Sequence, residues 1–154
     1  MWYNVHMDKL SDIVTDEYIY KLAEEQDKGK TYTVGKTGKK RYYYDDGTPV
    51  FPPNHGIDGE TWVETLLPGV RVSRYGMDSG RCFSPESDDF HSRSLPIRKK
   101  LHVYIVKEPI QVTAGRVLPW FGEKGGGVQY TPVGKNANGE KLKIRDLKGK
   151  LEEI

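Results

Sequence analysis

Four side chains along the chain have the chemistry to hold and transform an anionic substrate. His102 carries an imidazole, which exchanges protons near neutral pH. Arg74 and Arg93 carry guanidinium forks, whose geometry matches a phosphate or a carboxylate. The amide of Gln129 donates and accepts hydrogen bonds, but it cannot take a proton from water. Such a set could bind a phosphate-bearing molecule and orient it.

Each of these residues also has a plainer structural interpretation. A histidine within a strand is more often a hydrogen-bonded structural residue, and an arginine at a strand end often only extends to solvent. Arg81, which precedes Phe83-Ser84-Pro85, is open to the same two interpretations as Arg74 and Arg93. Cys82 has only Arg81 beside it to activate a thiolate. The chain contains no dinucleotide-binding glycine fingerprint, phosphate loop, nucleophile elbow or zinc-protease helix.

The elements that must position these residues are short strands behind one helix. Apolar spacing predicts an amphipathic helix over residues 8–28, ended by Gly29, and the tyrosine run 41–44 favours an amphipathic strand before an Asp-Gly turn. In the cleanest strand, 101–106, His102 and Tyr104 share the less apolar face, which suits a cleft wall. Further strands are expected at 62–67, 70–74, 110–113 and 128–130, with a short C-terminal helix near 144–147. This order indicates an α+β domain built on a small antiparallel sheet.

The segment Gly115–Tyr130 combines an aromatic pair with three consecutive glycines, Gly125 to Gly127. Adjacent glycines cost backbone entropy, so we expect them where backbone turns sharply or approaches something closely. If that neighbour is a ligand, the glycines let the loop lie against it. Trp120 and Phe121 then either stack on the ligand or belong to the core.

Bulk composition sets limits on the class of protein. The 154 residues fit one domain, and a net charge of +2 is too small to indicate nucleic acid or a membrane as partner. The sequence has no apolar run of membrane-spanning length and no signal-peptide core at its start. One cysteine excludes an internal disulfide. We expect a protein acting in a cytosol, its own or that of a target cell, or a piece of a larger exported protein.

Several motifs together resemble one known family, that of the tuberculosis necrotizing toxin domain. The similarity spans about residues 51–133, in order and with similar gaps, and leaves residues 1–45 outside. The motifs are Phe51-Pro52-Pro53-Asn54-x-Gly56, Arg74-Tyr75-Gly76, Gly80-Arg81-Cys82-Phe83-Ser84-Pro85, Arg93-Ser94-Leu95-Pro96, His102-Val103-Tyr104, Val112-Thr113-Ala114-Gly115, Pro119-Trp120-Phe121-Gly122 and Gly125-Gly126-Gly127-Val128-Gln129-Tyr130.

The resemblance implies an NAD glycohydrolase that cleaves the nicotinamide–ribose bond, often as a toxin domain. It implies an ADP-ribosyltransferase-like sheet core over 51–154, preceded by a helical and hairpin extension over 1–50. NAD would be the substrate, with no cofactor and no metal, and an immunity or inhibitor protein is the expected partner. His102 and Gln129 match catalytic residues of the family. The expected substrate-binding residues are Arg74, Tyr75, Arg81, Phe83, Ser84, Arg93 and Phe121.

Three departures from the family pattern keep related outcomes open. Glu123-Lys124 stands where the family commonly has Gln-Pro, and an aromatic residue that the family often places near Cys82-Phe83 has no single counterpart here. The connection from Arg93 to His102 is also shorter than usual. A dry, closed cleft would favour cyclic ADP-ribose, formed by an ADP-ribosyl cyclase, over hydrolysis. The rivals from other classes are a nuclease-type toxin, suggested by the lysine-rich segment 28–41, and a non-catalytic binding module.

Overall fold

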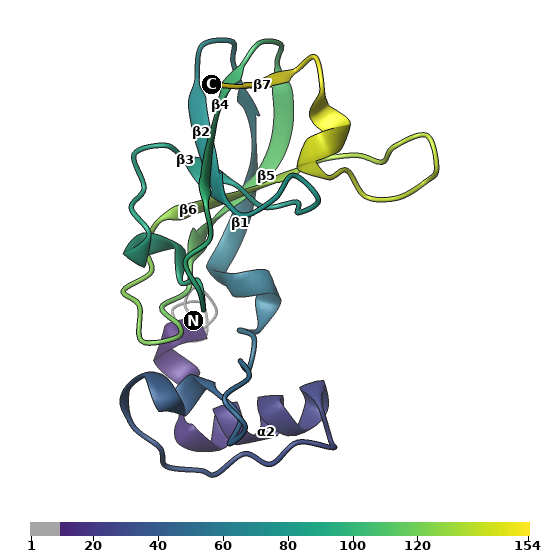
Figure 1. The fold of residues 1–154 in the computed structure, drawn as a ribbon. Coiled ribbons are helices and arrows are strands. Elements are labelled where there is room, and N and C mark those ends of the chain that lie inside the picture. Colours follow the sequence, from purple (N-terminus) through teal and green to yellow (C-terminus); the bar gives the residue numbers. More distant parts are fainter. Residues whose placement is uncertain (1–9) are drawn as a thin grey trace, which may run out of the picture.

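Two antiparallel sheets make up most of the computed structural model, which describes residues 10–154. They stand together in the upper part of Figure 1, above the helical N-terminal segment. The first sheet has the order β1 (Ile57–Leu66), β5 (Ile110–Val117) and β6 (Val128–Pro132). The second has the order β3 (Ser84–Pro85), β2 (Arg71–Tyr75), β4 (Leu101–Val106) and β7 (Leu151–Glu153).

A single bridge joins the two sheets. The backbone N–H of Phe83 donates to the carbonyl of Tyr130 over 3.1 Å, and the return bond measures 2.7 Å. Both side chains are buried in the main hydrophobic core, so one face of both sheets packs inward. The other core members come from both sheets and from the C-terminal segment: Leu66, Val72, Tyr104, Val106, Ile110, Val112, Ala114, Ile144, Leu147 and Leu151.

The predicted strand 101–106 is confirmed as β4, but its faces are the reverse of the expectation. Tyr104 and Val106 are buried in the main core, whereas Leu101 is exposed. His102 alternates with these residues and therefore lies on the core-facing side, at its rim. Tyr104 is not a cleft wall, because its ring fills space between the sheets.

The other predicted strands are present near their expected positions, but their lengths differ from the prediction. β1 and β5 are longer than expected, and β2 is shifted by one residue. The prediction of a strand over the tyrosine run was wrong, since Gly38–Tyr42 is a 3-10 helix and only Tyr43 makes a bridge, to Pro49. The rings of Tyr42 and Tyr43 pack instead on Trp120 and Phe121.

The N-terminal helix is shorter than its apolar spacing suggested. A 3-10 turn, Leu10–Ile13, precedes α2 (Asp16–Gln26), and residues 8 and 9 of the predicted helix lie outside the described residues. Thr15 caps α2, because its hydroxyl accepts the backbone N–H of Tyr18 at 3.1 Å. Gly29 is not the helix stop: the C-cap is Asp27, whose carboxylate accepts the Gly29 N–H at 3.0 Å.

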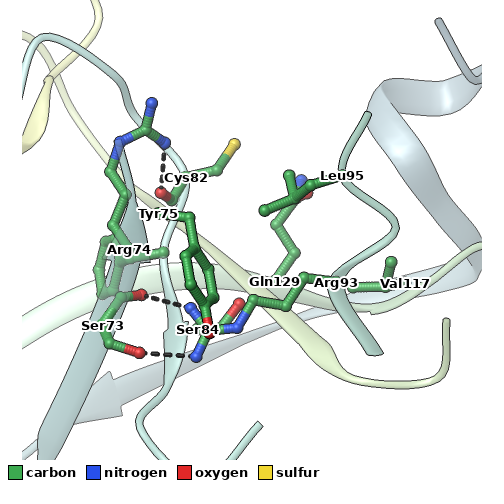
Figure 2. Close-up of a pocket in the computed structure, with 10 residues that line it drawn as sticks. Ser73, Arg74, Tyr75, Cys82, Ser84, Arg93, Leu95, Val117 and Gln129 are labelled. Carbon is green, nitrogen blue, oxygen red and sulfur yellow. Dashed lines mark hydrogen bonds between the residues drawn. The ribbon is translucent and has the colours of Figure 1, made fainter. Parts of the chain in front are cut away.

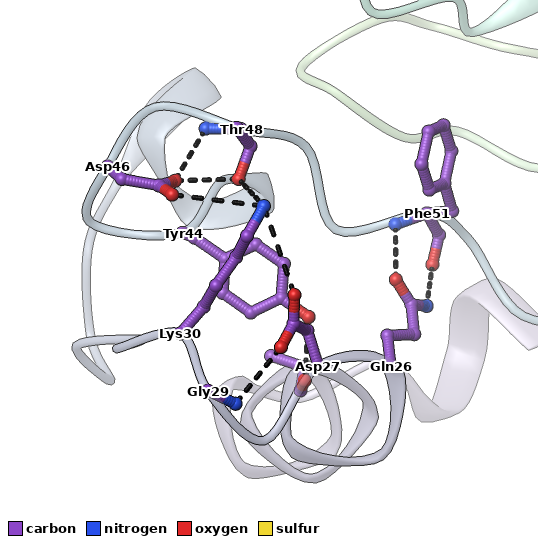
Figure 3. A network of polar contacts seen from close by, with 9 residues as sticks. Gln26, Asp27, Gly29, Lys30, Tyr44, Asp46, Thr48 and Phe51 are labelled. Atoms are coloured by element: carbon purple, nitrogen blue, oxygen red, sulfur yellow. Dashed lines mark hydrogen bonds and ion pairs between the residues drawn. The ribbon is translucent and has the colours of Figure 1, made fainter.

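A second core ties the N-terminal third to the end of β5. Ile19, Ala23 and Val50 pack there with Leu118 and Trp120. The indole Nε1 donates to the carbonyl of Val50 over 2.8 Å, so the ring is both packed and hydrogen-bonded. In Figure 3 the side-chain amide of Gln26 pairs with both backbone groups of Phe51, at 2.6 and 2.9 Å. These contacts fix the segment that leads into β1.

The C-terminal part closes the second sheet. Ile144–Leu147 is a 3-10 turn of 4 residues rather than an α-helix, and β7 then pairs with β4. Within residues 10–154, none of the helices has the length and apolar character to span a bilayer. The same residues contain no group of three or more metal-ligating side chains.

Candidate active site

Gln129, on β6, lies where three cavities meet. One of about 50 Å³ lies toward β2, one of about 340 Å³ lies along β1 and β5, and one of about 160 Å³ lies beside the residues that follow β5. Gln129 is the one described residue that lines all three. Figure 2 shows the smallest cavity, with Gln129, Arg93 and Tyr75 around it.

The strand pattern turns the Gln129 amide away from the core. Its neighbour Tyr130 is buried in the core, so Gln129 projects from the opposite face of the sheet. The amide Nε2 donates to the backbone carbonyl of His55 over 3.1 Å. This bond orients the amide and leaves its oxygen available as an acceptor.

The two larger cavities differ in chemical character. The cavity of about 160 Å³ is mainly apolar and aromatic, with Phe51, Leu95 and Phe121 in its wall. The cavity of about 340 Å³ is polar and cationic, and it contains three threonine residues and the side chains of Arg81 and Lys141. A ligand with an apolar ring at one end and polar groups at the other would lie across Gln129.

Arg93 is buried against the outer face of β2. Its guanidinium donates to the carbonyls of Asp88, Ser73 and Pro85 and to the Ser73 hydroxyl, at 2.6 to 3.3 Å. No carboxylate among the described residues pairs with it, and burial lowers the pKa of this arginine from its ordinary value. The predicted fork is therefore largely occupied by protein acceptors, but its charge faces two of the cavities.

Arg74 has its guanidinium turned toward the loop that follows β2. Nε donates to the carbonyl of Met77 and Nη1 to the carbonyl of Cys82, both at 2.8 Å. A Cβ on Gly80 would lie 1.9 Å from Nη2, so this glycine makes room for the fork. Among the described residues Nη2 has no hydrogen-bond partner, and Arg74 keeps a donor for a ligand.

The remaining predicted substrate-binding residues fall into two groups. Tyr75 stacks on Arg93, with the guanidinium carbon 5.0 Å from the ring centre, and with Ser84 it lines the smallest cavity. Phe83 touches that cavity but is chiefly a core residue. Arg81 lines the largest of the three cavities, and its Nε donates to the carbonyl of Leu142 over 3.0 Å.

The structure does not bring His102 to Gln129. His102 lies on the core-facing side of β4, directly opposite Arg74 in register, and it lines none of the three cavities. Its Nδ1 is 2.7 Å from a carboxylate oxygen of Glu153 on β7. The expectation that His102 and Gln129 belong to one catalytic site is corrected in this respect, because His102 lines none of the cavities that meet at Gln129 and its imidazole pairs with Glu153 instead.

The glycine run and the aromatic pair serve packing rather than an open cleft. A Cβ on Gly125 would meet backbone atoms of residues 117–119 at 2.7 to 2.9 Å, and one on Gly127 would meet Asp88 and Ser92 at 2.8 to 2.9 Å. At these two positions the loop lies against other protein atoms, whereas a Cβ on Gly126 would meet nothing within 4 Å. Trp120 is a core residue, while Phe121 is 2% exposed and still lines the apolar cavity.

Backbone strain is concentrated around Gln129. In the described part of the chain, the non-glycine residues with positive φ are Asn54 (52°), His55 (53°), Ser94 (48°) and Phe121 (55°). Each lines at least one of the two larger cavities, and His55 lines both. Such conformations cost about 1 kcal/mol or more each and gather at functional sites. The Pro-Pro-Asn-His-Gly sequence is typical of a tight turn, but nothing in it marked His55 as a residue that lines these cavities.

Cys82 borders two of the cavities but lacks the setting of a nucleophile. Burial raises the pKa of its thiol, and the positive charges of Arg74 and Arg81 offset this only in part. A raised pKa leaves little thiolate at neutral pH. The structure offers no support for nucleophilic catalysis by this cysteine.

Comparisons with known proteins identify the family of this chain. The family model described as tuberculosis necrotizing toxin matches residues 65–154. A curated relative, the conidial surface nicotinamide adenine dinucleotide glycohydrolase nadA of Aspergillus fumigatus, is 29% identical over an alignment of 101 residues, and the match covers 55% of this chain and 43% of that protein. The chain thus spans less than half the length of this relative.

A similar fold occurs in a solved structure of the tuberculosis necrotizing toxin complexed with its immunity factor. The two chains are 20% identical, the TM-score is 0.57, and the match covers 88% of this chain and 82% of the other. At this identity the likeness concerns the fold alone.

Proposed function

Since the chain belongs to the tuberculosis necrotizing toxin family, we propose that it is an NAD glycohydrolase that releases nicotinamide and ADP-ribose from NAD. The observation that carries this proposal is the position of Gln129 at the junction of an apolar and a cationic cavity. The Aspergillus relative, named as an NAD glycohydrolase, supports it over the matched 55% of the chain.

The chemistry suits a site without a carboxylate pair. Nicotinamide leaves the cationic pyridinium ring as a neutral molecule, so its departure needs no proton. The barrier lies in the positive charge that develops on the ribose, an oxocarbenium-like state comparable to that of glycoside cleavage. An amide that holds the ribose hydroxyls in one orientation lowers this barrier by positioning. Gln129 takes this role in the proposal, and the reaction uses water and no cofactor.

The ligand is placed by the character of the cavities. The nicotinamide ring enters the apolar cavity beside Phe121, and the ribose lies at Gln129. The pyrophosphate lies toward the cationic side of Gln129, where Arg81 and Lys141 line the cavity of about 340 Å³ and Arg74 and Arg93 line the smallest cavity. Arg74 has a free Nη2 donor, and such a charge-assisted bond is worth about 1.5–3 kcal/mol. Arg93 contributes charge, since most of its donors are bound to backbone carbonyls.

His102 enters the proposal through Arg74 rather than through direct contact at Gln129. The two residues are register partners on β4 and β2, and Glu153 fixes the imidazole. The proposed site also includes Tyr75 and Ser84 in the smallest cavity. We further propose that the two joined sheets are related to the sheet core of ADP-ribosyltransferases. Residues 1–50 are then an extension that supports the segment leading to β1.

A toxin role and a protein inhibitor belong to the same proposal. The structure with a similar fold is that of a toxin bound to its immunity factor. A protective protein that blocks the cleft at Gln129 would keep a producing cell from losing its NAD. To test this part, the chain is expressed in a bacterial host with and without a candidate inhibitor protein. The host's growth should stop when the chain is expressed alone and recover when the inhibitor is expressed with it.

The deciding experiment is incubation of the purified chain with NAD, followed by chromatography of the products. We expect nicotinamide and ADP-ribose in equal amounts. Cyclic ADP-ribose as the main product would replace hydrolysis by cyclisation. If neither appears and NAD is recovered intact, the proposed activity is wrong, and a parallel incubation with RNA tests the nuclease alternative.

A further inference from the structure

One imidazole in the cleft is free to meet a ligand. The chain has four histidines, of which His6 lies outside the described residues. The rings of His91 and His102 each bind a glutamate, at 2.5 and 2.7 Å. The ring of His55 makes no hydrogen bond or ion pair with any part of residues 10–154, and the residue is exposed.

Among the described residues, only Gln129 occupies a position like that of His55. Both residues line the apolar and the cationic cavity, and no other described residue lines both. The carbonyl of His55 accepts the hydrogen bond that orients the Gln129 amide. A ligand held by this amide in either cavity would therefore share that cavity with His55.

The turn that presents His55 is tightly held. Asn54, His55 and Gly56 all have positive φ, and glycine is the residue that adopts such a conformation without cost. The Gly56 N–H donates to the carbonyl of Pro53 at 3.0 Å, and its own carbonyl accepts the Leu118 N–H at 2.8 Å. The imidazole thus projects from a rigid, strained turn, as preorganised groups at functional sites do.

We infer that His55 is a catalytic residue of the proposed reaction and accepts the proton of the attacking water. This inference rests on the proposed NAD glycohydrolase function. The C1′–N bond breaks with its electron pair going to the nicotinamide nitrogen, and the water oxygen bonds to C1′. One water proton passes to the imidazole and then to solvent. Gln129 cannot take this proton, whereas an imidazole does so near neutral pH.

The test compares two histidine substitutions in the full chain. His55→Asn removes the imidazole and keeps a residue that tolerates positive φ. His91→Asn removes an exposed imidazole outside the three cavities and serves as the matched control. Nicotinamide release is measured from pH 5 to 9. Proton transfer typically contributes about 100-fold or more, so we expect His55→Asn to lose at least about tenfold in kcat and to lose the rise of kcat with pH.

The control should stay within about twofold of the unmodified chain, and added imidazole should restore part of the activity of His55→Asn because the position is exposed. If His55→Asn fails to fold, as judged by its thermal midpoint, His55→Gly is measured in its place, since glycine suits the turn. Unchanged kcat, KM and pH profile in the folded variant would overturn the inference and leave the proposed function intact. Absence of nicotinamide release by the unmodified chain would instead overturn the proposed function.

Discussion

The side-chain amide of Gln129 donates a hydrogen bond to the backbone carbonyl of His55, 74 residues earlier in the chain, over 3.1 Å. This bond joins the last strand of the first sheet to the strained turn before β1. It also defines the place where the apolar and the cationic cavity meet.

Replacement of Gln129 by glutamate should abolish most NAD cleavage. A carboxylate has the same shape, but it cannot donate to the His55 carbonyl, so the side chain should leave its fixed orientation. We expect a loss of about 100-fold in kcat, since positioning can supply a large part of a barrier. The matched control is Gln111→Glu on the neighbouring strand β5, where the side chain is exposed. Equal turnover in both variants would contradict the assignment.

Replacement of Gly80 by alanine should disturb Arg74 without changing Arg74 itself. The new Cβ would lie 1.9 Å from Nη2, and the end of a long side chain moves more cheaply than backbone. We expect KM for NAD to rise about three- to tenfold, which is less than the loss of a whole charge-assisted bond because Arg74 is displaced rather than removed, with stability changed by less than about 0.5 kcal/mol. Gly29→Ala is the control, because its Cβ meets nothing closer than 3.4 Å. A KM unaffected by Gly80→Ala would remove Arg74 from the proposed site.

Trp120→Phe should destabilise the second core. The substitution leaves the buried carbonyl of Val50 without its donor and opens a void, which together cost about 2–3 kcal/mol. The free energy of unfolding in urea measures this loss. Trp62→Phe, on the exposed side of β1, should change it by less than about 0.5 kcal/mol. Similar losses in both variants would argue against a structural role for the Trp120 bond.

Cys82 should react slowly with iodoacetamide. Burial raises the pKa of its thiol, so at pH 7.5 a smaller fraction is thiolate than in a free cysteine, and the rate should increase only at more alkaline pH. We expect alkylation at least about tenfold slower than that of a small free thiol, with the difference lost in guanidinium chloride. The chain has one cysteine, so mass spectrometry reads the rate directly. Faster reaction than the free thiol would point to an activated nucleophile.

The sequence predicted secondary structure best where neighbouring residues along the chain decide it. The β-branched run at Leu101–Val106 predicted β4 with its bounds, and the Pro-Gly pair after Leu67 separated β1 from β2. The tyrosine run misled, because aromatic rings pack equally well from a 3-10 turn when a distant Trp120 offers a surface. Which face of β4 is buried depended on sheet partners that periodicity does not identify.

The sequence alone determined the family and the types of side chain available, because ordered motifs are a property of the linear chain. Only the tertiary structure decided which of those side chains meet. His102 is drawn to Glu153 across β4 and β7, while a bridge between Phe83 and Tyr130 turns Gln129 to the other face, where it meets His55. The physical reason is that strand pairing, and which face of a sheet is buried, depend on residues far apart in the sequence. These two features set the direction of every side chain along a strand.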